Sequence, residues 1–245
     1  MDIAKEKEKA KVEDKPKKKS QVVYSKTEEK FNIISHLVGT ILASIGTTFM
    51  LIRVIAGASR GDYFSPTLAV YSIYLYGIAL ISLFLASTLY HAQPRDSKRR
   101  AVFQRIDHCM IAVIIAASYA PYMLIGMLES TERSDIVWSI AIASVILAMT
   151  ILVTVLKAIN PQKFKLFCLI AFVVMGWASL IRIHRVFIVM GWEVFALLLA
   201  GGIAYTVGII FFKKKSIKFN HGIWHIFVIA GAAMHFASVN FFILQ

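Results

Sequence analysis

The chain has 245 residues, of which 58% are hydrophobic and 17% are charged, and its formal net charge is +13. This balance excludes an ordinary soluble domain, because a water-soluble core of this size could not bury so much apolar surface. The basic residues form no stripe on a soluble module, which argues against a nucleic-acid partner. The composition therefore predicts an integral membrane protein.

Residues 1–30 are predicted to form a polar tail on the cytosolic side. They are rich in Lys and in acidic residues, and they lack the apolar core and cleavage site of a signal peptide. We expect this tail to be disordered, with its KPKKK segment (15–19) either contacting anionic headgroups or simply staying solvated. Residues 31–245 are predicted to form the membrane domain.

Seven long apolar runs follow the tail, and each approaches the roughly 20 residues that a helix needs to cross a bilayer. Their continuous apolarity favours helices over barrel strands, which alternate polar and apolar residues. The fifth run is the weakest, because Arg182 and Arg185 closely follow its uninterrupted part, so a six-helix bundle is the alternative. We predict an all-α bundle of seven transmembrane helices. The runs are 33–56, 67–91, 106–128, 136–156, 166–183, 188–212 and 221–244.

The distribution of charge predicts the orientation of the bundle. When the tail and every second loop are assigned to one side, that side holds 22 of the 27 Lys and Arg residues. Basic residues concentrate on the cytosolic side of membrane proteins. We therefore expect a multi-pass protein of the cell membrane with its N-terminus in the cytosol and its C-terminus outside.

Polar groups occur in the second and third runs close to a basic loop. STLYHAQPR (87–95) closes the second run with His91, and RIDHCM (105–110) opens the third with Asp107. Ser87 lies one helical turn before His91 and shares its face. Ionisable groups in membrane segments are costly, and by default they mark a functional site or a water-filled cavity.

The last run begins with a pair of histidines. His221 and His225 are four residues apart, so their rings lie on one face of a helix, as in helical zinc sites. Both follow the basic segment 213–218 directly. They are therefore expected to lie at the same depth as His91 and Asp107, near the cytosolic face.

These residue types predict a zinc site of the catalytic kind. Three neutral imidazoles, from His91, His221 and His225, would leave the fourth position for water, and zinc lowers the pKa of such a water to about 7. The residues between the two helical histidines include no carboxylate, so Asp107 is predicted to be the general base. Ser87 is predicted to donate a hydrogen bond to a developing oxyanion.

Each of these residues also has a simpler interpretation. A histidine at a helix end is often an interfacial hydrogen-bonding group, an aspartate there often interacts with the helix dipole, and a buried serine often only packs. Five other positions carry weaker expectations. His36 should line the cavity or pack, His108 should contact the outer shell or headgroups, His184 should lie in an outside loop, Asn220 should cap the last helix, and His235 should hydrogen-bond another helix.

Four segments carry a resemblance to a known family when they are taken in order. They are EEKFNIISHLVG (28–39), STLYHA (87–92), RIDHCMIAVIIAASYAPY (105–122), and GGIAYTVGIIFF (201–212) followed by HGIWHIFVIAGAAMHF. Together they resemble the hemolysin III branch of the progestin and adiponectin receptor (PAQR) family.

The resemblance implies a seven-helix fold with a zinc ion (Zn2+) near the cytosolic face. By motif, the ligands would be His91, His221 and His225, with Asp107 near the metal water and Ser87 beside it. Alkaline ceramidases share this constellation, and some bacterial members resemble proteins linked to membrane-lipid homeostasis.

The preferred function is therefore a zinc-dependent hydrolase of a lipid amide or ester, with membrane lipids as substrate or ligand. A zinc-braced receptor or regulator and a pore-forming cytolysin are the alternatives. The residues favour the hydrolase over the receptor, because three imidazoles leave a water position. They disfavour a pore, because apart from His235 and scattered Ser and Thr the runs show no polar lining through the midplane.

Overall fold

The computed structural model describes residues 24–160 and 163–244, and these residues include helices but no strands. Within these described residues, seven helical spans are long and apolar enough to cross a membrane, so the predicted seven-helix fold is confirmed and the six-helix alternative is wrong. Residues 1–23 of the predicted tail lie outside the described residues, and residues 26–30 are helical, as part of α2. The helices are α2 (Lys26–Arg60), α3 (Pro66–Ala92), α4 (Lys98–Pro121), α5 (Arg133–Ile159), α6 (Lys165–Gly176), α7 (Ile183–Met190), α8 (Trp192–Lys213) and α9 (Asn220–Ser238).

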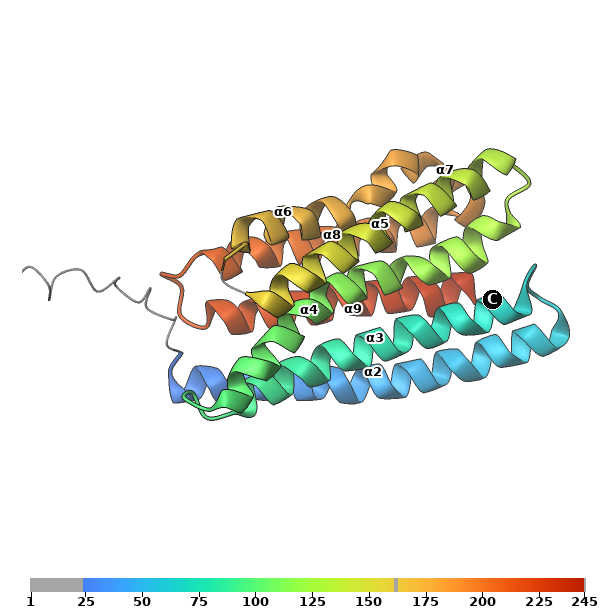
Figure 1. Ribbon diagram of the computed structural model, residues 1–245. Coiled ribbons are helices and arrows are strands. Elements are labelled where there is room, and N and C mark those ends of the chain that lie inside the picture. The colour runs from blue at the N-terminus through green and yellow to red at the C-terminus, as the bar shows by residue number, and fades with distance from the viewer. Residues whose placement is uncertain (1–23, 161–162, 245) are drawn as a thin grey trace, which may run out of the picture.

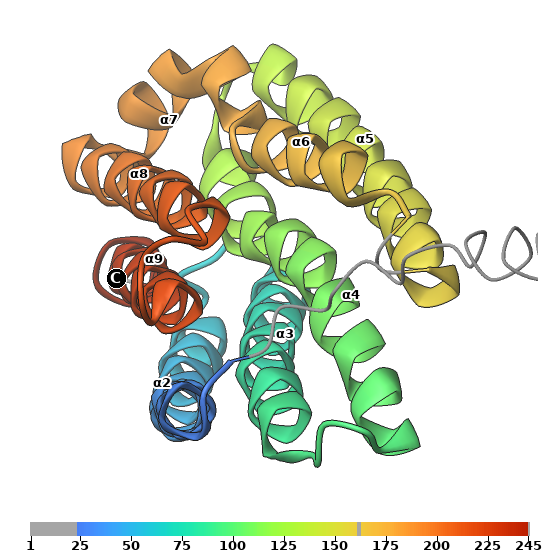
Figure 2. The same ribbon diagram turned by 90° about the vertical axis from the view of Figure 1, so that its left-hand side faces the viewer.

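The spans run alternately up and down one elongated bundle (Figure 1). Seen along its axis, α2, α3, α4, α5, α6 and α8 follow one another, and α9 closes the arrangement by packing between α8 and α2 (Figure 2). The two ends of the described chain lie at opposite ends of the bundle. This is what an odd number of spans requires.

The first span shows how the sequence determines which face of a helix is buried. Small and polar residues recur every four positions, at Ser35, Gly39, Ala43 and Thr47, and all four are buried, whereas large apolar residues on the opposite face are exposed. Small residues let membrane helices approach closely. At Gly39 an added Cβ would lie 2.8 Å from the ring of Phe84 on α3.

The same helix begins seven residues before the predicted run, because its N-terminus is capped. The Ser25 hydroxyl accepts a hydrogen bond from the Glu28 amide at 3.1 Å, and the Glu28 carboxylate accepts one from the Ser25 amide at 2.7 Å. This reciprocal pair is a capping box. It extends α2 by two turns and brings Glu29 beside the last turn of α3.

The fifth span is broken close to the arginines that interrupt its apolar run in the sequence. A 3-10 turn, Ala178–Arg182, separates α6 from α7. The hydroxyl of Tyr119 on α4 donates to the Met175 carbonyl oxygen at 2.8 Å and accepts from the Ser179 amide at 3.2 Å. A side chain of a neighbouring helix thus forms hydrogen bonds with the backbone groups that lose their helical partners at the break. Because the chain turns helical again, His184 lies on α7, and the prediction of a loop there was wrong.

A buried ion-pair cluster ties α5 to the broken span at the far end of the bundle. Asp135 is fully buried and accepts hydrogen bonds from Arg185 at 2.6 Å and from Arg182 at 2.8 Å. The Ser130 hydroxyl donates to the same carboxylate at 2.6 Å. Two arginines that weaken the hydropathy signal of this span are therefore paired with an acid.

Replacing Asp135 with Asn should destabilise the bundle strongly, because two arginines would lose their counter-charge. Breaking a buried ion pair by removing one partner costs about 3–5 kcal/mol. Thermal unfolding in detergent would measure the loss. The matched control is Asp62→Asn, which removes an exposed pair with Arg60 and should cost at most about 1 kcal/mol. Equal effects of both substitutions would contradict a bracing role for the cluster.

Candidate metal centre

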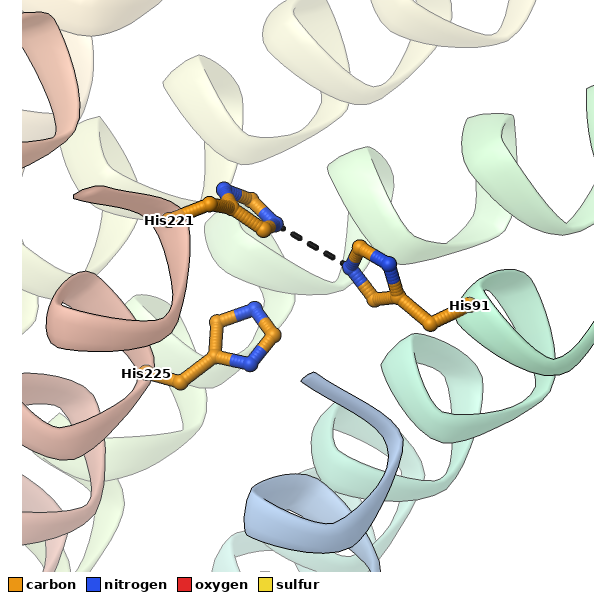
Figure 3. Close-up of side chains that lie close together, drawn as sticks. All are labelled: His91, His221 and His225. Atoms are coloured by element: carbon orange, nitrogen blue, oxygen red, sulfur yellow. Dashed lines mark hydrogen bonds between the residues drawn. The ribbon is translucent and has the colours of Figure 1, made fainter. Parts of the chain in front are cut away.

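Three histidine side chains converge at the end of the bundle where α2 begins (Figure 3). His91 comes from the last turn of α3, and His221 and His225 come from the first two turns of α9. The Nε2 atoms of His91 and His221 are 3.1 Å apart, and the ring centroids of His221 and His225 are 4.5 Å apart. One ligand nitrogen from each ring lies within 4.8 Å of the other two. These are the three residues that the sequence predicts as metal ligands.

A carboxylate fixes the orientation of the His91 ring. Glu29 Oε2 lies 2.7 Å from Nδ1 of His91, and Glu29 Oε1 accepts a hydrogen bond from Arg100 at 2.5 Å. An ionised carboxylate only accepts hydrogen bonds, so the proton of the neutral imidazole must be on Nδ1. The Nε2 atom therefore presents its lone pair towards His221. Carboxylates behind histidines in this way are typical of metal ligands.

The first helix orients His225 in the same manner. The Ser35 hydroxyl donates to the Asn32 carbonyl oxygen at 3.1 Å and lies 3.1 Å from Nδ1 of His225. Because its single proton is directed at Asn32, the hydroxyl accepts from the Nδ1–H group. The Nε2 atom of His225 is then left with a lone pair. His36 covers the ring, with a centroid distance of 3.7 Å.

This set of donors fits a divalent metal ion such as zinc. Neutral imidazole nitrogens are standard zinc ligands, and His91 and His225 are both held with an unprotonated Nε2. The Nδ1 atom of His221 is buried and has no hydrogen-bond partner among the described residues. Tyr24 stacks on His221 with a centroid distance of 5.2 Å. Burial raises the pKa of the Tyr24 phenol, so this neighbour adds no negative charge of its own at neutral pH.

The two residues predicted to be catalytic lie in the bundle interior, on α3 and α4. Ser87 on α3 is only 1% exposed, and Asp107 on α4 is partly buried. Both line the same cavity as His221 and His225. In the described part of the chain, the group whose ligand atoms could share one ion comprises the three histidines and does not include Asp107. Asp107 therefore lines the cavity that contains two of the candidate ligands but is not itself in the group that could share an ion.

A cavity of about 1260 Å³ extends from the histidines through the bundle. Apolar side chains such as Phe172 and Leu198 line its middle part, and Trp138 and Asp135 line its far end. This volume exceeds the range of roughly 300–1,000 Å³ that is usual for small-molecule pockets. The cavity is large enough for a long acyl chain.

Three other polar residues in the membrane helices, His235, Asn220 and His36, were given expected roles from the sequence. His235 forms the predicted hydrogen bond to another helix, since its Nε2 lies 3.3 Å from the Leu198 carbonyl oxygen on α8. Asn220 does not cap α9, because it is the first residue of that helix and its side chain donates to the Phe212 carbonyl oxygen at 2.8 Å. His36 both packs and lines the cavity.

Sequence reasoning missed Glu29 and Ser35, which support the candidate ligands. The signal for Glu29 was present in the capping box formed by Ser25 and Glu28. This capping box starts the helix at Lys26, earlier in the chain than the apolar run, and places Glu29 at the depth of His91. Ser35 carries no comparable signal. A serine on a membrane helix is usually a packing residue, and only the contact with α9 reveals its partner.

Glu29→Gln should weaken metal binding about 10- to 100-fold, because the substitution removes the charged acceptor behind His91. Zinc affinity can be measured by competition with a chelating dye. Glu193→Gln is the control, since it removes the same charge from an exposed carboxylate at the start of α8, at the other end of the bundle. If the two variants bound zinc equally well, Glu29 would have no role in orienting His91.

A seven-span helical bundle with three histidines gathered inside one end defines a class of integral membrane protein with a candidate metal site. The family model described as haemolysin-III related matches residues 24–236. The chain therefore belongs to the haemolysin III family, which is part of the PAQR family, as its motifs indicated.

Curated relatives agree with this assignment. The chain is 34% identical over 222 residues to "Hemolysin-3" of Bacillus cereus, covering 89% of this chain and 92% of that protein. It is 33% identical over 221 residues to a "Hemolysin-3 homolog" of Bacillus subtilis (strain 168), covering 89% and 95%. It is also 31% identical over 174 residues to the human "Monocyte to macrophage differentiation factor", covering 68% of each chain.

Proposed function

We propose that this protein is a zinc-dependent membrane hydrolase that cleaves an amide or ester bond of a lipid, in the manner of a ceramidase, and contributes to membrane-lipid homeostasis. One observation carries the proposal: histidines able to share a metal ion open onto a long cavity with an apolar middle. An acyl chain in the apolar part would bring its carbonyl group beside the histidines.

The residues around the site have complementary roles in this reaction. His91, His221 and His225 would hold zinc, which when bound polarises a carbonyl group and lowers the pKa of water to about 7. Asp107 would take a proton from the attacking water and return it to the leaving amine or alkoxide as the C–N or C–O bond breaks. Ser87 would donate a hydrogen bond to the carbonyl oxygen as it becomes negative.

We place the histidine end of the bundle at the cytosolic face of the cell membrane. The loops on this side and the segment 1–30 together hold 22 of the 27 basic residues. The positive-inside rule then puts the N-terminus in the cytosol. Residues 31–245 form the membrane domain in this proposal, and residues 1–30 form its cytosolic tail.

The names of the Bacillus relatives raise a lytic function as a second candidate. The lining of the cavity is mostly apolar, with polar groups such as Tyr122, Thr206 and His235 interspersed. This favours a lipid over an ion path, because a channel needs continuous polar lining through the membrane. Dye leakage from liposomes that contain the purified protein would test lysis separately. Leakage that survives removal of the metal would support a pore.

The hydrolase proposal is tested by incubating the reconstituted protein with long-chain ceramide and with phospholipids and measuring released fatty acid. We expect release that stops when a chelator removes the metal and returns when zinc is added. A protein that retains zinc but releases no fatty acid from any of these lipids would instead support the zinc-braced receptor or regulator.

A further inference from the structure

Basic side chains line both sides of the cavity at its histidine end, and Arg95, Lys98 and Arg100 lie on the side of α3 and α4 together with carboxylates. The opposite side, which we call the positive side, is lined by lysines and by no carboxylate among the described residues. Lys157, Lys165, Lys213 and Lys215 line the cavity there and come from α5, α6, the end of α8 and the turn that follows it. Figure 2 looks onto this end of the bundle. Lys157 is only 7% exposed, which is unusual for a lysine.

The carboxylates that line this end of the cavity lie on its other side. They are Glu29, Asp96 and Asp107, from α2, the α3–α4 loop and α4. Glu29 is already engaged with His91 and Arg100. Within the described ranges, neither Lys165 nor Lys215 forms an ion pair. The positive side of the cavity mouth therefore has an excess of cationic groups.

Contacts place this positive side close to the candidate metal centre. The Lys215 ammonium lies 4.2 Å from the centroid of the Phe212 ring, and that centroid is 5.5 Å from the centroid of His221. The pKa of Lys215 is lowered, first by partial burial and then by the positive charge of Lys165. The two lysines line the same end of the cavity with like charge, and a bound anion would offset that charge.

A buried hydrogen-bonding group adds to the lysines. His108 on α4 lines the same cavity, and its Nδ1 atom is buried without a hydrogen-bond partner among the described residues. A neutral imidazole can donate one hydrogen bond to an anion, and a lysine ammonium can donate three. Both are groups that recognise phosphate oxygens.

The positive-inside rule explains why lysines occur at this end, but it does not explain why several of them line the cavity. The same connecting segments also contain Lys163, Lys214 and Lys218, which contribute equally to the positive charge on this side of the membrane. These three lysines are not among the residues that line the cavity. The arrangement therefore separates lysines that face the cavity from lysines that do not.

We propose that the cavity selects a lipid with a phosphate-bearing headgroup, which binds to Lys165, Lys215 and His108 while the acyl chain occupies the apolar part. This inference rests on the proposed hydrolase function and names its substrate class. In such a lipid only a few covalent bonds separate the phosphate from the acyl carbonyl. That spacing agrees with the single aromatic ring between Lys215 and His221.

The test compares two lipids that differ only in the phosphate, dioleoyl phosphatidic acid and dioleoylglycerol. Binding to the full-length, zinc-loaded protein in neutral nanodiscs is measured by native mass spectrometry. We expect phosphatidic acid to bind and dioleoylglycerol to bind at least about tenfold more weakly, since a charge-assisted hydrogen bond contributes this much or more. Inorganic phosphate at the same concentration should not displace the lipid, because it gains nothing from the apolar part.

Two double variants with the same change in charge decide whether the lysines of the cavity are responsible. Lys165→Gln with Lys215→Gln should weaken phosphatidic acid binding at least about tenfold, and Lys163→Gln with Lys214→Gln should leave it unchanged. Unchanged zinc content and unfolding temperature would show that both variants fold. Equal losses in both, equal binding of the two lipids, or displacement by inorganic phosphate would overturn the inference.

The same samples distinguish this inference from the proposed function. Hydrolysis of neutral lipids without selective binding of phosphatidic acid would refute the headgroup site and leave the hydrolase intact. Selective binding without release of fatty acid from any lipid would refute the hydrolase while leaving the binding site in place.

Discussion

Protein in which His225 is replaced by alanine should purify without zinc, whereas the parent protein should carry about one zinc ion per chain. His225 is 1% exposed, and Ser35 holds its Nδ1–H group, so its Nε2 atom is committed to the position shared with His91 and His221. A zinc site of this kind needs its three imidazoles, and two would not retain the ion through dialysis. Inductively coupled plasma mass spectrometry gives the zinc content directly.

The control is the same substitution at an exposed histidine on the opposite end of the bundle. His184→Ala on α7 should leave the zinc content at the level of the parent protein. Thermal unfolding of both variants would show whether the loss of zinc reflects the missing ligand or a general loss of fold. If zinc stayed bound after His225→Ala, or were absent from the parent, the metal centre as proposed would not exist.

Asp107→Asn should have the second-largest effect, and this effect should be on fatty-acid release and not on zinc content. Asp107 lines the cavity beside Ser87 but is outside the group of atoms that could share the ion. The variant should therefore keep its zinc and lose fatty-acid release by about 10²- to 10⁴-fold, which is the usual contribution of a general base. Asparagine has nearly the same shape as aspartate, so packing should be preserved.

The ratio of lipid turnover to zinc content separates the role of Asp107 from that of a ligand. Asp62→Asn, at the far end of the bundle, should leave both quantities unchanged. Loss of zinc in Asp107→Asn would make Asp107 part of the metal site itself. Full turnover with zinc retained would exclude it as the base.

The fold was largely predictable, because in lipid the length of an apolar run and the charges at its ends determine a span. The errors have local physical causes. The capping box at Ser25 extends the first helix into a polar segment that hydropathy excludes. In the fifth span, Tyr119 and Asp135 on neighbouring helices stabilise a break and two arginines that look unfavourable in the sequence alone.

The candidate site was predictable in depth but not in its lateral contacts. Basic loops fix the height of His91, Asp107 and His221 in the membrane, and a spacing of four residues fixes the shared face of the two histidines on α9. Which helix faces which depends on packing. For this reason Glu29 and Ser35, which reach the histidines from α2, were found only in the structure.

The central claim is that imidazoles from α3 and α9 bind one zinc ion together. X-ray absorption at the zinc edge of the purified protein, recorded on the parent and on His91→Ala, tests it most directly. The claim predicts three imidazole ligands and one oxygen ligand in the parent, with no sulfur, and no zinc-edge signal from His91→Ala. A spectrum with sulfur ligands, or one that His91→Ala leaves unchanged, would contradict it.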